Sequence, residues 1–198
     1  MRRPSGILLA GGAARRFGRP KLLEPVRGEP LFHHSLRALA AACEEVVVVL
    51  APAAPDPPLP DGSGPVRFVR DPRAHEGPLV GALVGLGEVV GDHAILAGAD
   101  MPGLRAELLD LMARRLAASG RSAVLLADED GPRPLPAALA TRPALTLAGE
   151  LVRRGERRLR ALVAGLEALV LSESDWSVVD ALGEWRRDVD VPEDLPKR

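Results

Sequence analysis

Four basic residues follow a pair of glycines near the N-terminus, directly after a short apolar run. Residues 7–10 are apolar, and Gly11 and Gly12 interrupt the run. The cations that follow are Arg15, Arg16, Arg19 and Lys21. Glycines let backbone N–H groups approach a ligand closely, and a local concentration of cations favours an anion. The segment therefore predicts a polyphosphate-binding loop, although the glycines alone are better explained by a tight turn with solvated arginines.

A carboxylate follows a second apolar run. Asp100 comes shortly after residues 94–97 and stands before Met101 and Pro102. Mg²⁺ takes oxygen ligands, and one or two carboxylates together with substrate phosphates are enough to hold it. Asp100 is therefore a candidate magnesium ligand. The alternative is an N-cap for a helix that begins near Ala106, a common role for aspartate.

These two loops need a scaffold, and the rest of the chain supplies one by alternating apolar runs with amphipathic stretches. Strands are expected at residues 7–10, 46–51, 66–69, 94–97, 123–127 and 168–171. Helices are expected at residues 31–42, 79–90, 106–119, 144–153 and 157–166. This alternation predicts an α/β fold of three layers, a mostly parallel sheet with helices on both faces. Right-handed crossovers then bring the glycine loop and Asp100 to the same carboxyl edge.

Composition limits the class of protein. The 198 residues, 46% of them hydrophobic, predict a single domain over 1–198 with a substantial core. A net charge of −1 gives no general attraction to nucleic acid or to an anionic membrane. The one cysteine, Cys43, excludes a disulfide framework and a cysteine-based zinc site. No signal peptide and no apolar run of about 20 residues stands out, so we expect a cytoplasmic protein.

Residues 9–21 resemble the signature L-A-G-G-x-x-x-R-[MF]-G-x-x-K of nucleotidyltransferases that join a nucleoside triphosphate to a phosphorylated acceptor. This superfamily includes sugar-1-phosphate enzymes and the molybdenum cofactor guanylyltransferases and cytidylyltransferases. The resemblance implies a Rossmann-like fold of the nucleotide-diphospho-sugar transferase type, with Arg16 and Lys21 opposing the charge of a bound triphosphate. It implies that the loop wraps the triphosphate with the backbone of Leu9, Ala10, Gly11 and Gly12.

Two further segments carry the same resemblance. The aspartate of A-D-M-P is similar to the metal-binding residue of the superfamily, which implies that Asp100 holds Mg²⁺. The segment that begins Gly77-Pro78-Leu79 resembles G-P-L-A-G of the molybdenum cofactor enzymes, where an upstream aspartate, here Asp71, helps hold the nucleotide. Asp71 before a proline is otherwise a turn starter.

The second half of the chain resembles the guanylyltransferases in two short patterns, P-L-x-A at residues 134–137 and G-E-R at residues 155–157. The resemblance implies a wall for the pterin with Arg157 and Arg158 near its phosphate. An ordinary helix start with local charge pairs is the alternative reading.

The tail R-D-V-D-V-P-E-D-L, residues 187–195, gives only weak evidence on whether the nucleotide is GTP or CTP. Guanylyltransferases usually carry asparagines where Asp188 and Asp190 stand, whereas cytidylyltransferases carry aspartates. The chain contains no asparagine anywhere, so a general loss of asparagine is an alternative explanation of these aspartates, and they discriminate less between the two enzymes. Asp190 is a candidate second metal ligand, or alternatively the N-cap of a helix that begins at Pro192.

The resemblance implies a magnesium-dependent transfer of GMP from GTP to molybdopterin, with Lys21, Arg16 and Asp100 as the catalytic residues. The alternatives are transfer from CTP, a sugar-1-phosphate enzyme, and a carrier that binds nucleotide or pterin without turnover. Other molybdenum cofactor biosynthesis proteins are the partners that the family implies. No polar side chain in Leu50-Ala51-Pro52 is placed to read the base. We expect packing roles for Cys43, both tryptophans and one of the histidine pair at 33–34.

Overall fold

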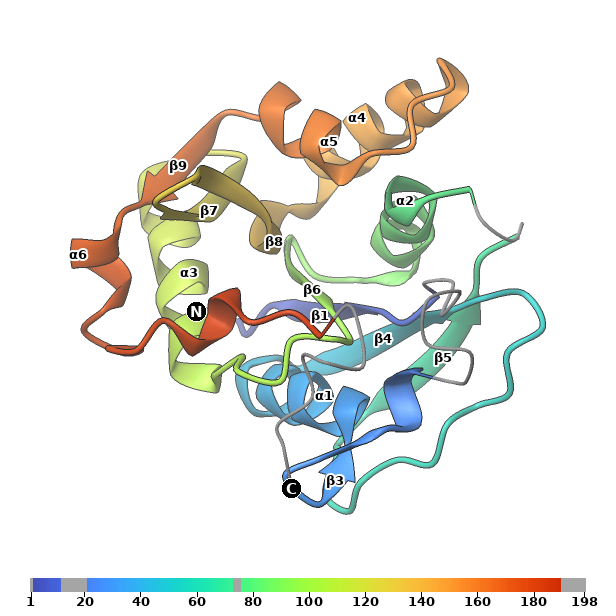
Figure 1. Ribbon diagram of the computed structural model, residues 1–198. Coiled ribbons are helices and arrows are strands. Elements are labelled where there is room, and N and C mark those ends of the chain that lie inside the picture. The colour runs from blue at the N-terminus through green and yellow to red at the C-terminus, as the bar shows by residue number, and fades with distance from the viewer. Residues whose placement is uncertain (1, 12–20, 73–75, 190–198) are drawn as a thin grey trace.

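The computed structural model describes residues 2–11, 21–72 and 76–189, and its centre is a seven-stranded sheet (Figure 1). Its strands are β1 (Ser5–Leu9), β4 (Glu45–Leu50), β5 (Val66–Arg70), β6 (His93–Gly98), β7 (Ala123–Asp128), β8 (Gly131–Ala140) and β9 (Ala168–Leu171). Their order across the sheet is β5-β4-β1-β6-β8-β7-β9. A separate two-stranded hairpin joins β2 (Pro25–Val26) to β3 (Glu29–Pro30).

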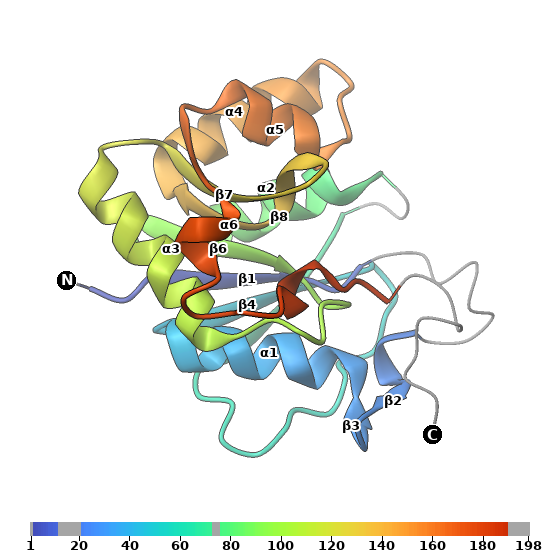
Figure 2. The same ribbon diagram turned by 60° about the vertical axis from the view of Figure 1, so that its left-hand side comes forward.

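Helices cover both faces of this sheet, as Figure 2 shows. The helices are α1 (Leu31–Ala42), α2 (Pro78–Glu88), α3 (Ala106–Ser119), α4 (Thr141–Arg153), α5 (Leu159–Gly165) and α6 (Glu173–Trp176). Two short 3₁₀ turns are η1 (Lys21–Leu23) and η2 (Glu184–Arg186). Helices α1 and α3 lie on one face, and α2, α4 and α5 lie on the other. The predicted three-layer arrangement is therefore confirmed.

The pleat of the central strands divides the apolar residues between two cores. In β4, Val46 and Val48 belong to the core under α1 and α3, whereas Val47 and Val49 belong to the core under α2 and α5. Successive side chains of a strand point to opposite faces, so a run of valines fills both cores. A strand buried on both sides in this way is typical of a parallel sheet between two helical layers.

The sheet is mostly parallel, as expected, with one antiparallel strand. Strand β8 runs antiparallel to both β6 and β7, and β9 pairs in parallel with β7. Pattern reading did not predict β8, because Pro132, Pro134 and Pro136 interrupt its sequence and prolines are rare inside strands. Helix α4 also begins earlier than expected, at Thr141. The other expected strands and helices are present, with ends displaced by at most two residues.

The proline-rich segment between β4 and β5 contains no helix or strand and forms an irregular loop. It passes along the outer side of α1 (Figure 2), where the Pro58 carbonyl oxygen lies 2.9 Å from His33 Nε2. Within the described ranges, no helix combines the length and the apolar character needed to cross a membrane.

Candidate active site

Two charged side chains from separate loops meet where β1 and β6 end. Lys21 Nζ donates to Asp100 Oδ2 across 3.0 Å. The two strands are parallel neighbours, and the amide of Ala99 donates to the carbonyl of Leu9 just beyond their last paired residues. The side chain of Lys21 is 14% exposed and that of Asp100 is 34% exposed, so the pair is partly shielded from water. The expected meeting of these loops at the carboxyl edge is thus observed.

The orientation of the Asp100 carboxylate depends on a glycine two residues earlier. A methyl group built on Gly98 would lie 2.6 Å from Asp100 Oδ1, which is too close for a real contact. Gly98 therefore leaves room for the carboxylate to fold back over the end of β6. Sequence reasoning missed this residue, and the signal that could have found it is a glycine at the end of an otherwise apolar strand.

The backbone of the same turn is held from two further directions. The Val189 amide donates to the carbonyl oxygen of Asp100 across 3.0 Å. The Ser35 hydroxyl, fully buried on α1, donates to the carbonyl oxygen of Met101 across 3.1 Å. Val189 thus reaches the turn that carries Asp100. The contact of Ser35 was not foreseen from the sequence.

The predicted phosphate-binding backbone is described only in part. Leu9 ends β1, and the amide of Ala10 donates to the carbonyl of Val49 across 2.8 Å, so this amide is engaged by the sheet. Gly11 is exposed at the same edge. Three predicted site residues lie outside the described residues: Gly12, Arg16 and Asp190.

Asp71 and Gly77 lie on either side of the passage from β5 to α2. The amide of Asp71 donates to the carbonyl of Leu50, which places it beyond β5 at the carboxyl edge, two strands from β1. Gly77 precedes α2 with a φ of +91°, and a methyl group there would lie 2.8 Å from the carbonyl oxygen of Arg157. The G-P-L segment and the G-E-R turn are therefore packed directly against each other.

Both arginines of the G-E-R-R turn are engaged with carboxylates. Arg157 lies 3.4 Å from the carboxylate of Glu76, and Arg158 lies 2.8 Å from that of Glu156. The Arg158 guanidinium, with help from the amides of Arg157 and Arg158, lowers the pKa of Glu156 to about 2. Glu156 thus organises the start of α5. The side chain of Arg158 remains 81% exposed.

The remaining polar and sulfur-containing candidates have the packing roles that were expected. Trp176 and Trp185 are buried and meet edge to face, with ring centroids 5.7 Å apart. His33 is buried, and His34 Nε2 lies 2.8 Å from the carbonyl oxygen of Val26. Burial raises the pKa of the Cys43 thiol to about 12. The described ranges contain no group of three or more metal-ligating side chains.

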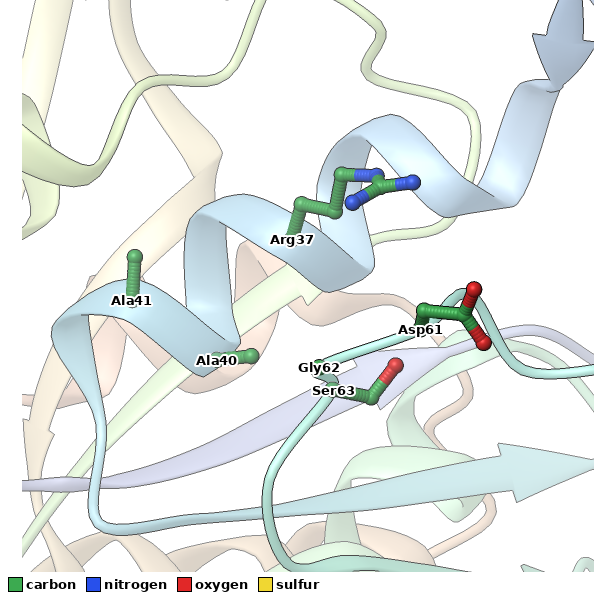
Figure 3. Close-up of a pocket in the computed structure, with 6 residues that line it drawn as sticks. All are labelled: Arg37, Ala40, Ala41, Asp61, Gly62 and Ser63. Carbon is green, nitrogen blue, oxygen red and sulfur yellow. The ribbon is translucent and has the colours of Figure 1, made fainter.

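A pocket of about 220 Å³ lies away from these residues, between α1 and the proline-rich loop (Figure 3). Its lining residues are Arg37, Ala40, Ala41, Asp61, Gly62 and Ser63. None of the predicted site residues that the structure describes lines it, so this pocket is separate from the charged pair at the carboxyl edge.

Two protein relatives resemble this chain along most of their length. The probable molybdenum cofactor guanylyltransferase of Mycobacterium tuberculosis is 34% identical over 176 residues, which cover 86% of this chain and 84% of the relative. The protein of the same name from Chloroflexus aggregans is 31% identical over 196 residues, covering 96% of this chain and 91% of the relative.

Solved structures share the fold at lower identity. Molybdopterin-guanine dinucleotide biosynthesis protein A from Archaeoglobus fulgidus superposes with a TM-score of 0.77 at 20% identity, covering 96% of this chain and 94% of that one. A Mycobacterium tuberculosis protein solved as a complex with manganese gives a TM-score of 0.60 at 22% identity, with 86% and 88% coverage.

The match to a family model covers most of the residues discussed above. The model of the MobA-like NTP transferase domain matches residues 6–171, a range that includes Lys21, Asp71, Gly77 and Asp100. Together with relatives more than 30% identical, this match shows what kind of enzyme carries the site. The chain belongs to the MobA-like NTP transferases, a family of nucleotidyltransferases.

Proposed function

We propose that this nucleotidyltransferase transfers GMP from GTP to the terminal phosphate of molybdopterin, which gives molybdopterin guanine dinucleotide and pyrophosphate. The observation that carries the proposal is the Lys21–Asp100 pair at the carboxyl edge. A cation for phosphates and a carboxylate for a metal stand together there, on loops whose sequences match the family. The names of the relatives support guanine as the base.

The residues present fit a magnesium ion that arrives with the nucleotide. Asp100 is one carboxylate at the site, and its side chain is about one-third exposed. A single carboxylate is a weak resident site but suits Mg²⁺, which takes its other ligands from phosphates and water. Asp100 would hold the ion with Asp190 as the second ligand, and when bound the ion neutralises phosphate charge. The manganese complex of the similar Mycobacterium tuberculosis protein supports a divalent ion.

The reaction requires the protein mainly to position the two substrates and to stabilise the negative charge of their phosphates. An oxygen of the terminal phosphate of molybdopterin attacks the α-phosphorus of GTP, and the bond to the β-phosphate oxygen breaks to release pyrophosphate. A phosphate monoester has a second pKa of about 6, so the attacking group is already ionised at neutral pH and needs no strong base. Lys21 and Arg16 bind the triphosphate and stabilise the charge that develops on the leaving pyrophosphate.

The remaining parts of the proposal concern the setting of this reaction. The backbone of residues 9–12 lies along the triphosphate, and Asp71 and Gly77 contribute to the nucleotide site from the neighbouring loop. We assign residues 1–198 to one nucleotidyltransferase domain that works in the cytoplasm. Other proteins of molybdenum cofactor biosynthesis would deliver the pterin or receive the dinucleotide.

A cytidylyltransferase is the second candidate, and the sequence of the tail favours it. Asp188 and Asp190 stand where guanylyltransferases usually carry asparagines. Val189, between these two positions, donates its amide to the carbonyl of Asp100, so it lies at the candidate site. Calorimetric titration with GTP, CTP and UTP in the presence of Mg²⁺ separates the two candidates. Preference for GTP supports the proposal, preference for CTP replaces guanine by cytosine, and binding of no nucleotide overturns both.

Variants of the charged pair test the assignment of residues. Lys21→Ala and Asp100→Ala should fold normally and lose pyrophosphate release by about 100-fold or more, since they remove groups that act on transition-state charge. Arg2→Ala is the matched control, because Arg2 forms an exposed ion pair with Glu44 at the opposite end of the strands. Activity close to that of the control in either site variant would refute the role given to that residue.

A further inference from the structure

The segment that follows β9 crosses the molecule and ends at the turn that carries Asp100. We call residues 172–189 the strap. Figure 2 shows it running from α6 past α3 towards the edge where β1 and β6 end. Its last described residue, Val189, donates its amide to the carbonyl of Asp100 across 3.0 Å. The strap therefore joins the outer strand of the sheet to the candidate metal ligand.

A buried carboxylate fixes the middle of the strap. Asp180 is only 2% exposed, and its two oxygens accept hydrogen bonds from the amides of Glu184 and Trp185, each across 3.1 Å. The ring of Trp185 is buried against Trp176, whose Nε1 donates to the carbonyl of Ala127. Because a buried carboxylate is costly unless its oxygens are bonded, this geometry specifies one path for the chain.

The strap then packs against the Asp100 turn at a point with no spare space. A methyl group built on Gly103 would lie within 2.0 Å of the carbonyl oxygen of Glu184. Glu184 is one of the two residues whose amides Asp180 holds, and five residues later Val189 reaches Asp100. A displacement of the Asp180 side chain would therefore shift the Val189 amide and the Asp100 carbonyl to which this amide donates.

We propose that Asp180 is a positioning residue of the nucleotidyl-transfer site: it fixes the strap, and the strap, through the Val189 amide, holds the backbone of Asp100 so that its carboxylate is aimed at the metal. This inference rests on the proposed function, in which Asp100 binds the ion. Groups that orient a metal ligand without touching the metal typically change its affinity by about 10–100-fold when removed.

Asp180→Asn is the sharpest variant. It keeps the size of the side chain but replaces one acceptor oxygen by an NH₂ group, which faces an amide N–H and cannot accept from it. Val163→Ala is the matched control, because Val163 is buried in the core on the opposite face of the sheet and loosens the fold without touching the strap. Gly103→Ala displaces Glu184 from the other side and is the second variant if Asp180→Asn does not fold.

Two measurements test the inference, both well below the melting temperature of every variant. Amide hydrogen exchange reports the strap directly and needs no ligand: Asp180→Asn should accelerate exchange at Val189, and Val163→Ala should not. Mn²⁺ binding in the presence of GTP, followed by electron paramagnetic resonance, should weaken about tenfold in Asp180→Asn and remain unchanged in the control.

The outcomes separate the inference from the proposed function. Unchanged exchange or unchanged Mn²⁺ affinity in Asp180→Asn overturns the positioning role while leaving the proposed function intact. An equal loss of affinity in Val163→Ala also overturns it, because the effect would then be general loosening. No Mn²⁺ binding by the wild-type chain with GTP overturns the proposed function, and the inference falls with it.

Discussion

Replacing Gly77 by alanine tests the packing between the G-P-L segment and the G-E-R turn. Gly77 has φ +91° and ψ 165°, a conformation open essentially to glycine alone, which costs another residue about 1–3 kcal/mol. The new methyl group would also lie 2.8 Å from the carbonyl oxygen of Arg157 and 2.9 Å from its Cβ. That oxygen accepts from the amide of Leu79, so it is not easily displaced.

The two effects together give an expected destabilisation of about 3 kcal/mol, with the overpacking adding about 1–2 kcal/mol to the backbone strain. For a chain of this length, each kcal/mol lowers Tm by about 2–4 °C, so Tm should fall by about 6–12 °C. Differential scanning calorimetry measures the shift.

Gly87→Ala is the matched control, and Gly87 lies ten residues further along the chain. Gly87 lies in α2, and a methyl group there meets no atom within 4 Å. Alanine is a better helix former than glycine, so the control should be stabilised by about 0.5 kcal/mol. If Gly77→Ala melts at the same temperature as the control, the close approach to Arg157 does not constrain the fold and the reasoning is refuted.

Three further outcomes are expected. Cys43, with its pKa raised to about 12 by burial, should resist a thiol reagent at pH 8 in the native state and react on unfolding, and rapid native labelling would contradict its burial. Glu156 should remain ionised at pH 4 in an NMR titration, because its pKa is lowered from 4.5 to about 2. The stabilisation it gives is complete above about pH 4.5 and is lost as the pH falls towards 2, and Arg158→Ala should raise this pKa. Removal of divalent ions by a chelator should weaken GTP binding in calorimetry, and equal affinity with and without the chelator would contradict a role for the metal.

Local patterns in the sequence were sufficient to predict the three layers of the fold and the carboxyl edge of the sheet, where the candidate site lies. Each valine of β4 faces one of two cores, so an unbroken apolar run predicts a strand covered on both sides. Parallel strands with helical crossovers then bring the loops after β1 and β6 together, and Lys21 meets Asp100. The shared edge follows from the alternation of strands and helices alone, whereas the pairing of β1 with β6, which puts Lys21 beside Asp100, joins segments that are far apart in the sequence.

The parts that were missed depend on distant contacts or on conflicting local signals. Strand β8 contains three prolines, and its pairing with β6 and β7 overrides the poor strand propensity. Gly103 and Glu184 are far apart in the sequence, yet they touch in the fold. Asp180 has no local signature, because its partners are backbone amides that the strap presents only after it has folded around that carboxylate.

Three separate contacts hold the turn after β6, and they determine which parts of the turn a bound ligand can displace. Lys21 holds the carboxylate of Asp100, Val189 holds its carbonyl, and Ser35 holds the carbonyl of Met101. Only the first of these contacts involves the carboxylate, so a ligand that displaces the ammonium leaves the backbone of the turn in place. A group held in advance does not have to be ordered when the ligand arrives, which is the condition for effective electrostatic catalysis. In the proposed function, Asp100 would hold the metal of a metal–triphosphate complex and Lys21 would bind its phosphates, so each charge of the pair would gain a new partner when the other is displaced.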